Sequence, residues 1–184
     1  MFRYDLEYED FNIDSLDKLS YQIKKIESII RNSKIYKRYL GKIYSEFPCV
    51  ISPDYSDINL LNSEMETEFH HIITLYDLVQ IVGSKMIADN EYDFLTYLDV
   101  AKEVLKVHME DLIPGCVLSV SYHQAIHAEE RQLDPELTGL HIGNWKEFIR
   151  RYSDFLSEND FKKYNLIGIS TKQIEEVLNV RKEN

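Results

Sequence analysis

The chain has few cysteines and no long apolar run. Only two cysteines, Cys49 and Cys116, occur among its 184 residues, and no CxxC pair is present. Neither a disulfide framework nor a thiolate zinc cluster is therefore supported, and a reducing cytoplasm is the default expectation. No apolar run approaches the roughly 20 residues of a membrane-spanning helix, and the acidic start MFRYDLEYEDFN lacks the apolar segment of a signal peptide. We expect a soluble, intracellular protein with no membrane partner.

Positive charge is also scarce overall, but it is concentrated in one segment. The chain carries 21 Lys and Arg against 32 Asp and Glu, a net charge of -11. That balance argues against a protein that coats nucleic acid nonspecifically, because phosphate binding requires dense positive charge. Between residues 18 and 42, however, Glu27 is the single acid, so this segment is either a solvated helix face or a local phosphate-binding surface. The candidate nucleic-acid-binding residues are Lys24, Lys25, Arg31, Lys34, Lys37 and Arg38.

Apolar residues recur at helical spacing through most of the chain, which predicts a mainly α fold with a small β-hairpin. Two short β-prone runs, over 65–73 and 117–120, are the candidate strands, and Ser119 or Ser121 can cap the helix after the second run. Residues 47–63 hold two prolines among Asp, Asn and Ser, and they predict an irregular connection. Helices are expected over 16–44, with a break at Asn32-Ser33, and over 75–86, 93–109, 145–156 and 171–180.

Four of the six histidines fall into two close pairs, which is the most informative feature of the sequence. Residues four apart share one face of a helix, so His123 and His127 can present two imidazoles to one divalent cation. His70 and His71 are adjacent, and adjacent residues of a strand point to opposite sides. If the pairs converge, His70 can be a third ligand while its neighbour deprotonates a water. Such a combination is typical of metal-assisted hydrolysis.

The double histidine, followed by a strand, a turn and an HxxxH helix, resembles the HNH, or ββα-metal, endonucleases, including the colicin-type nucleases. The strings EFHHIITLYDLVQIV, DVAKEVLKVHMEDLIPGCVLSVSYHQAIH and IGNWKEFIRRYSDF also resemble a group of bacteriophage proteins with HH-xx-TLYD and PLSxxxHxxxH segments. Tyr36-Lys37-Arg38-Tyr39 and Cys49 stand where that group has a YxxY helix and a cysteine, while Val117 replaces the proline before Leu118-Ser119. The resemblance extends from about Tyr36 to Phe155.

The resemblance implies an embedded ββα-metal (HNH-like) motif and a role for each histidine of the two pairs. His71 would be the general base, and His70, His123 and His127 would bind a divalent ion, Mg, Mn, Ni or Zn. It divides the chain into an N-terminal helical region with a basic helix (1–65), an HNH-like core with a helical insertion (66–156) and a C-terminal helical appendage (157–184), all within one compact domain.

The chain departs from the HNH pattern at one supporting position. Where that pattern has an asparagine, about nine residues before the first helical histidine, this chain has Pro114. His108 is the candidate to take over the supporting role. The alternative is that His108 is an ordinary residue near the end of a helix.

We therefore expect a metal-dependent DNA endonuclease of HNH type, encoded by a bacteriophage or prophage and acting in the cytoplasm of the infected bacterium. The basic helix would hold backbone phosphates, and recognition would depend on DNA shape or structure. A first alternative is a catalytically inactive nuclease-fold phage protein that binds a host or phage protein, supported by the acidic charge and the 13 tyrosines. A second is a zinc peptidase, but HQAIH differs from HExxH at Gln124, which cannot act as the base.

Overall fold

The computed structural model describes residues 12–47, 67–89, 94–128, 140–141 and 143–182. Cys49, the domain boundary expected at residue 65 and nearly all of the predicted connection over 47–63 lie outside these ranges. The described helices are α1 (Leu16–Asn32), α2 (Lys34–Glu46), α3 (Leu75–Asp89), α4 (Tyr97–Met109), α5 (Val120–His127), α6 (Trp145–Tyr152), the 3-10 helix η3 (Ser153–Phe155), α7 (Glu158–Leu166) and α8 (Thr171–Lys182). The described strands are β1 (Thr67–His71), β2 (Gly115–Ser119) and β3 (Leu140–His141).

The basic segment forms two helices joined by a single residue, as the sequence predicts. Ser33 has an extended backbone, with φ -69° and ψ 144°, and its N–H donates to the Ile30 carbonyl at the end of α1. Its hydroxyl accepts from the Tyr36 N–H at 3.0 Å and so caps α2. The change of direction at Ser33 lets both helices bury an apolar stripe while their basic residues stay in water.

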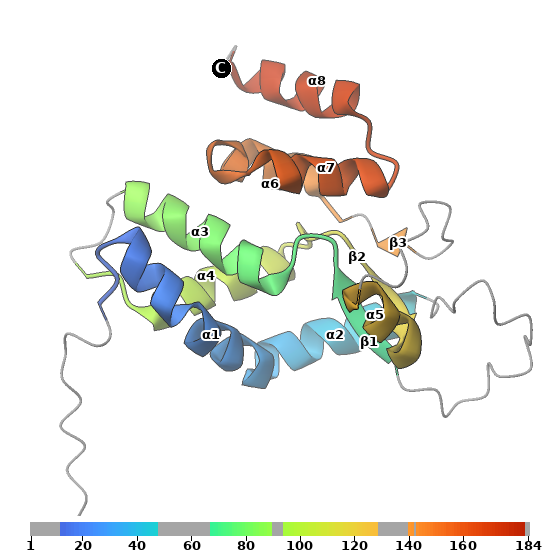
Figure 1. The fold of residues 1–184 in the computed structure, drawn as a ribbon, viewed down its shortest axis with the longest axis horizontal. Helices are drawn as coiled ribbons and strands as arrows, with labels where there is room; N and C mark the ends of the chain where they lie inside the picture. The colour runs from blue at the N-terminus through green and yellow to red at the C-terminus, as the bar shows by residue number, and fades with distance from the viewer. Residues whose placement is uncertain (1–11, 48–66, 90–93, 129–139, 142, 183–184) are drawn as a thin grey trace, which may run out of the picture.

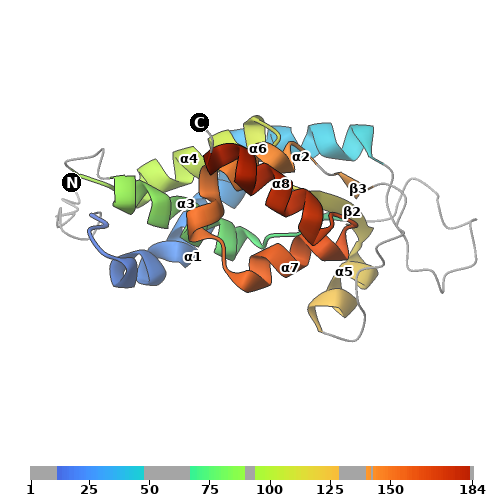
Figure 2. The same ribbon diagram turned by 90° about the horizontal axis from the view of Figure 1, so that it is seen from above.

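The helices stack in layers (Figure 1). α1 packs against both α3 and α4, and α2 packs against α4. α6, α7 and α8 lie on the other side of α3 from α1, as Figures 1 and 2 both show. Ile23, Leu78 and Val104 are fully buried aliphatic residues of the core between these layers, and Phe148 and Tyr164 are fully buried aromatic ones. No helix in the described part of the chain has both the length and the apolar character needed to cross a bilayer.

A small antiparallel sheet and α5 occupy one end of the molecule (Figures 1 and 2). β2 is the central strand, buried at all five positions, and pairs with β1 on one side and β3 on the other. Thr67 is opposite Ser119 and His71 is opposite Gly115, so the register brings the double histidine beside the residues that precede α5. Of the two serines considered as caps, Ser119 caps α5 by accepting from the Tyr122 N–H at 3.4 Å.

The predicted fold class is confirmed. The described chain is mainly helical, and β1, β2 and α5 form the ββα unit with α3 and α4 inserted between its strands. Three details differ from the prediction. Strand β3 and helix α7 were not predicted, and the helix expected over 145–156 ends at Tyr152 and continues as η3. A local signal for α7 exists in Ser157 and Asp160, which form a capping box at its start.

Candidate metal centre

The alternation of β1 separates its two histidines. Phe69 and His71 are buried towards the core, whereas Glu68 and His70 lie on the more open face, beside α5. The prediction that the adjacent histidines point to opposite sides of a strand is therefore confirmed. It gives the two imidazoles different surroundings and different partners.

His70, His123 and His127 converge on one point. One ligand nitrogen from each lies within 4.8 Å of the others, and the ε2 nitrogens of His123 and His127 are 3.0 Å apart. Two nitrogens that bind the same ion at about 2.0–2.1 Å lie roughly 3.0–3.4 Å apart, so this separation suits a shared metal ion. The δ1 nitrogen of His70 is buried and has no hydrogen-bond partner among the described residues. The three residues thus fit a divalent cation.

Glu68 fixes the orientation of one ligand. Its carboxylate accepts a hydrogen bond from the δ1 nitrogen of His123. A carboxylate at neutral pH is an acceptor only, so the proton resides on Nδ1 and the ε2 lone pair of His123 faces His127. Carboxylate partners of this kind hold metal-binding histidines in the required tautomer.

Burial favours the neutral form of two of the three ligand imidazoles, those of His70 and His127. Burial, and after it the charges of the neighbouring His123 and His127, lower the pKa of His70 to about 4. The pKa of His127 is also lowered, by burial and then by His123. Neutral imidazoles offer their lone pairs at pH 7, so an ion does not have to displace protons from them.

His71 belongs to a separate, buried pair with His108. The δ1 nitrogen of His108 donates to the carbonyl oxygen of Val104 at 2.7 Å, which leaves its ε2 nitrogen as an acceptor. The ε2 nitrogen of His71 lies 3.1 Å from it and therefore donates. In the neutral His71 ring the lone pair must then be on Nδ1. Burial and the charge of His108 lower the pKa of His71 well below its ordinary value.

The tyrosines of the YxxY segment enclose this pair. The Tyr36 ring is stacked on His71 with centroids 6.2 Å apart, and the Tyr39 ring contacts His108 edge-on at 5.1 Å. The segment therefore contributes aromatic packing rather than a ligand. His108 is in the last turn of α4, as an ordinary helix-end residue would be, and its ε2 nitrogen contacts that of His71, the candidate base.

Two cavities open onto the histidines. The first, the Arg31 cavity, has a volume of about 320 Å³ and is lined by Glu27, Arg31 and His123, among others. The second, the Leu166 cavity, has a volume of about 350 Å³ and is lined by Ile126, Lys163 and Leu166, among others. Both are also lined by His70, His71, Thr74 and His127, so the histidine centre is the junction between them.

Of the six basic candidates, Arg31 lines a histidine cavity. The other five line neither of these two cavities and are exposed on α1 and α2. One of them, Lys25, has its ammonium 5.6 Å from the centre of the Tyr97 ring. Gln124, the residue on which the peptidase alternative depends, is exposed and lines neither cavity.

The whole sequence, residues 1–184, matches the family model described as Bacteriophage G278-like virion protein. The chain belongs to this family. No curated protein and no solved structure matches it, and no nuclease family is identified by the comparisons. The bacteriophage part of the sequence resemblance is thus confirmed at the level of a virion protein family. The nuclease part stays a prediction.

In this virion protein the TLYD segment has a structural role that the sequence analysis missed. Thr74 accepts from the Asp77 N–H at 3.1 Å and donates its hydroxyl proton to the Asp77 carboxylate at 2.7 Å, which caps α3. The same carboxylate accepts from Lys163 of α7 at 2.7 Å. The segment therefore ties the C-terminal helices to the helix that follows the double histidine. Thr74 followed by Asp77 is the local signal, since Ser/Thr with an acid three residues later marks a helix start.

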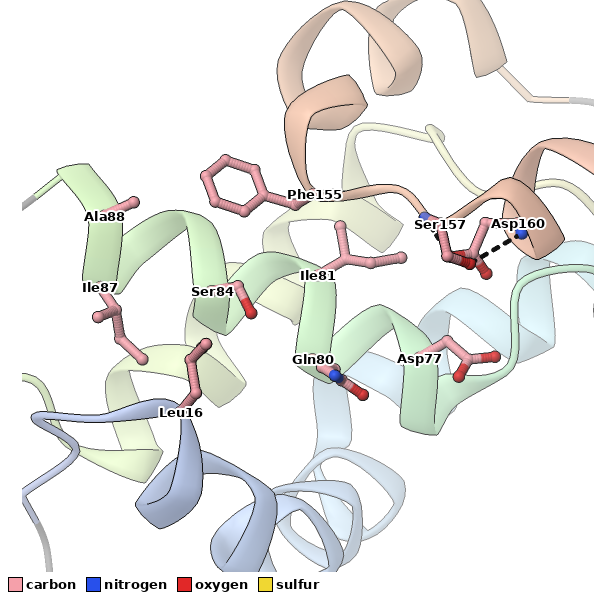
Figure 3. Close-up of a pocket in the computed structure, with 10 residues that line it drawn as sticks. All are labelled: Leu16, Asp77, Gln80, Ile81, Ser84, Ile87, Ala88, Phe155, Ser157 and Asp160. Carbon is pink, nitrogen blue, oxygen red and sulfur yellow. Dashed lines mark hydrogen bonds between the residues drawn. The ribbon is translucent and has the colours of Figure 1, made fainter.

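A larger cavity, of about 460 Å³, lies along α3 and is lined by none of the three metal-ligand candidates (Figure 3). Its ionisable residues among those described are Asp77 and Asp160. Asp77 accepts hydrogen bonds from Thr74 and Lys163. Asp160 accepts them from Ser157 and Lys163. No histidine lines it. Neither a metal-ligating group nor a proton-transfer pair lies there among the described residues, so the histidine junction is the stronger candidate site.

Proposed function

We propose that His70, His123 and His127 hold a divalent cation and that the centre hydrolyses DNA phosphodiesters, with His71 as the general base. The observation that carries the proposal is the convergence of three imidazoles at the junction of two open cavities, with a fourth histidine beside them. Structural zinc sites are closed by four protein ligands, whereas a site with three protein ligands leaves room for water and substrate. When bound, the ion would supply the positive charge that stabilises charge developing on the phosphate.

His71, His108 and Arg31 would each have a different role in the proposed hydrolysis. His71 lines both cavities through the small part of its surface that is exposed, 8%, and its δ1 lone pair is the one not engaged by His108. It would take a proton from the water whose oxygen forms the new bond to phosphorus, while the bond to the leaving oxygen breaks and that oxygen takes a proton from solvent water. His108 would keep the proton of His71 on the ε2 nitrogen, and Arg31 would face the phosphate.

Incubation of the purified chain with plasmid or branched DNA and Mg²⁺, Mn²⁺, Ni²⁺ or Zn²⁺ tests the proposal. We expect cleavage that His71→Ala abolishes without loss of bound metal. The double variant His123→Ala, His127→Ala should lose both metal and cleavage. His141→Gln is the matched control, because His141 is a buried histidine that pairs with Asp111 and lines neither histidine cavity. No cleavage with any ion, or cleavage that survives His71→Ala, would refute the catalytic assignment.

A second candidate follows from the family. A virion protein with no identified nuclease relative can keep such a centre for stability alone and act by binding another phage or host protein. This candidate predicts one bound metal per chain, a melting temperature that falls when the metal is removed, and a partner that His71→Ala still captures. Metal-dependent DNA cleavage would decide against it.

A further inference from the structure

We infer that the histidine centre acts on a DNA strand with an unpaired nucleotide, holding its phosphate against Arg31 and the adjoining nucleoside in the Leu166 cavity. The inference rests on the proposed hydrolysis and names its substrate class. It comes from the different chemistry of the two cavities that meet at the histidines.

The Arg31 cavity is the side suited to a phosphate. The Arg31 side chain is 58% exposed, and its ion pair with Glu27 has an N–O distance of 3.6 Å, beyond a good hydrogen bond. Its planar donors therefore remain free to grip two phosphate oxygens, a geometry that guanidinium groups favour. His123 and His127 line the same cavity, so a phosphate held by Arg31 would lie beside the metal ligands.

The Leu166 cavity differs in both charge and surface. Among the described residues that line it, the one cation is Lys163, which is already paired with Asp77 at 2.7 Å and Asp160 at 3.2 Å. Two carboxylates against one ammonium leave no net positive charge to attract a phosphate. The aliphatic side chains in its wall are those of Ile72, Ile126 and Leu166, and Leu166 is 52% exposed.

Apolar walls next to a phosphate site suit a nucleobase. A volume of about 350 Å³ is in the range of small-ligand pockets, and proteins that take up a base hold it between apolar or aromatic side chains. A base in an intact duplex is paired and stacked, so it cannot enter a concave pocket without being extruded. A strand crossing from one cavity to the other would pass over His70 and His127, which line both.

Binding of a fluorescein-labelled single-stranded oligodeoxynucleotide and of its duplex, followed by anisotropy in Mn²⁺ with the His71→Ala full chain, tests the inference. We expect the single strand to bind about tenfold more tightly than the duplex, and Arg31→Ala and Leu166→Glu each to weaken that binding by about tenfold. Arg150→Ala is matched to the first variant, since Arg150 also pairs with a glutamate at 3.6 Å and is 43% exposed. Leu98→Glu is matched to the second, at a leucine that is 44% exposed on α4.

The outcomes separate this inference from the proposed hydrolysis. Equal binding of single strand and duplex, or equal effects of the variants and their controls, would overturn the inference even if wild-type protein cleaves DNA. Selective single-strand binding that depends on Arg31 and Leu166 would support the inferred substrate. If the wild-type protein then cleaved no DNA, the proposed hydrolysis would be refuted, but the inferred single-strand binding site would still be supported.

Discussion

The ε2 nitrogens of His71 and His108 lie 3.1 Å apart, although 37 residues separate the two histidines in the sequence. The contact links β1 to the last turn of α4 and leaves the δ1 lone pair of His71 as the free one. Because His108 is anchored by the Val104 carbonyl, the orientation of His71 depends on a helix that lies outside the ββα unit. The helical insertion thus supports the candidate general base.

Acid should destabilise the metal-free protein through His108. Burial lowers the pKa of His108 from 6.5 to about 4 in the folded protein. Between these values the unfolded chain binds a proton that the folded chain does not, so the free energy of unfolding falls as pH falls from 6.5 to about 4. The share of His108 is at most about 3 kcal/mol. Urea unfolding of wild type and His108→Gln across this range measures it, and identical pH slopes would contradict the prediction.

Removing the carboxylate partner of His123 should weaken metal binding without unfolding the chain. Glu68→Ala frees the δ1 proton of His123 and lets the ring rotate, so we expect about 10- to 100-fold weaker binding of the ion. Glu68→Gln, which keeps an acceptor, should fall between wild type and Glu68→Ala. Calorimetric titration with Zn²⁺ or Mn²⁺ gives the affinities. Glu103→Ala, at a glutamate paired with Lys106 on α4, is the control and should bind metal as wild type does.

Gly115 should tolerate no side chain, because β1 passes very close to it. A Cβ there would overlap the Phe69 ring and lie 2.7 Å from the His70 carbonyl oxygen. Gly115→Ala should therefore cost about 1–3 kcal/mol and shift His70, which lowers metal affinity as well. Gly41→Ala is the opposite case, since a Cβ at this position in α2 meets nothing within 4 Å. That change should stabilise the protein by about 0.5–1 kcal/mol, and equal effects of the two would refute the close approach.

Lys163 should matter for stability more than an exposed lysine does. Its side chain is 19% exposed and joins Asp77 of α3 to Asp160 of α7. Lys163→Met leaves both carboxylates without their cation, and we expect a loss of about 1–3 kcal/mol in chemical unfolding. Lys106→Met, which breaks an exposed pair with Glu103, should cost less than about 1 kcal/mol. A similar loss of unfolding free energy in both variants would show that the link between α3 and α7 stabilises the protein no more than an exposed ion pair does.

Local patterns predicted much of the fold. The break at Ser33, the cap at Ser119 and the helical spacing of His123 and His127 all depend on residues within one turn of one another, and all are confirmed. The apolar stripe of α7 is short, with Phe161 only partly buried, so helical periodicity does not predict this helix, and its local signal is the capping box of Ser157 and Asp160. β3 was missed because two residues carry no periodicity.

Helix and strand periods are local geometry, so the residue order was enough to predict that His123 and His127 can share an ion and that His70 and His71 face apart. The contact of His70 with His123 and His127, the contact of His108 with His71, and the place of Arg31, alone of the six basic candidates, at a cavity of the centre emerge from the folded chain. Those relationships depend on pairing β1 with β2 across an inserted pair of helices. Contacts of that sequence separation arise from the packing of the whole core, which no local pattern encodes.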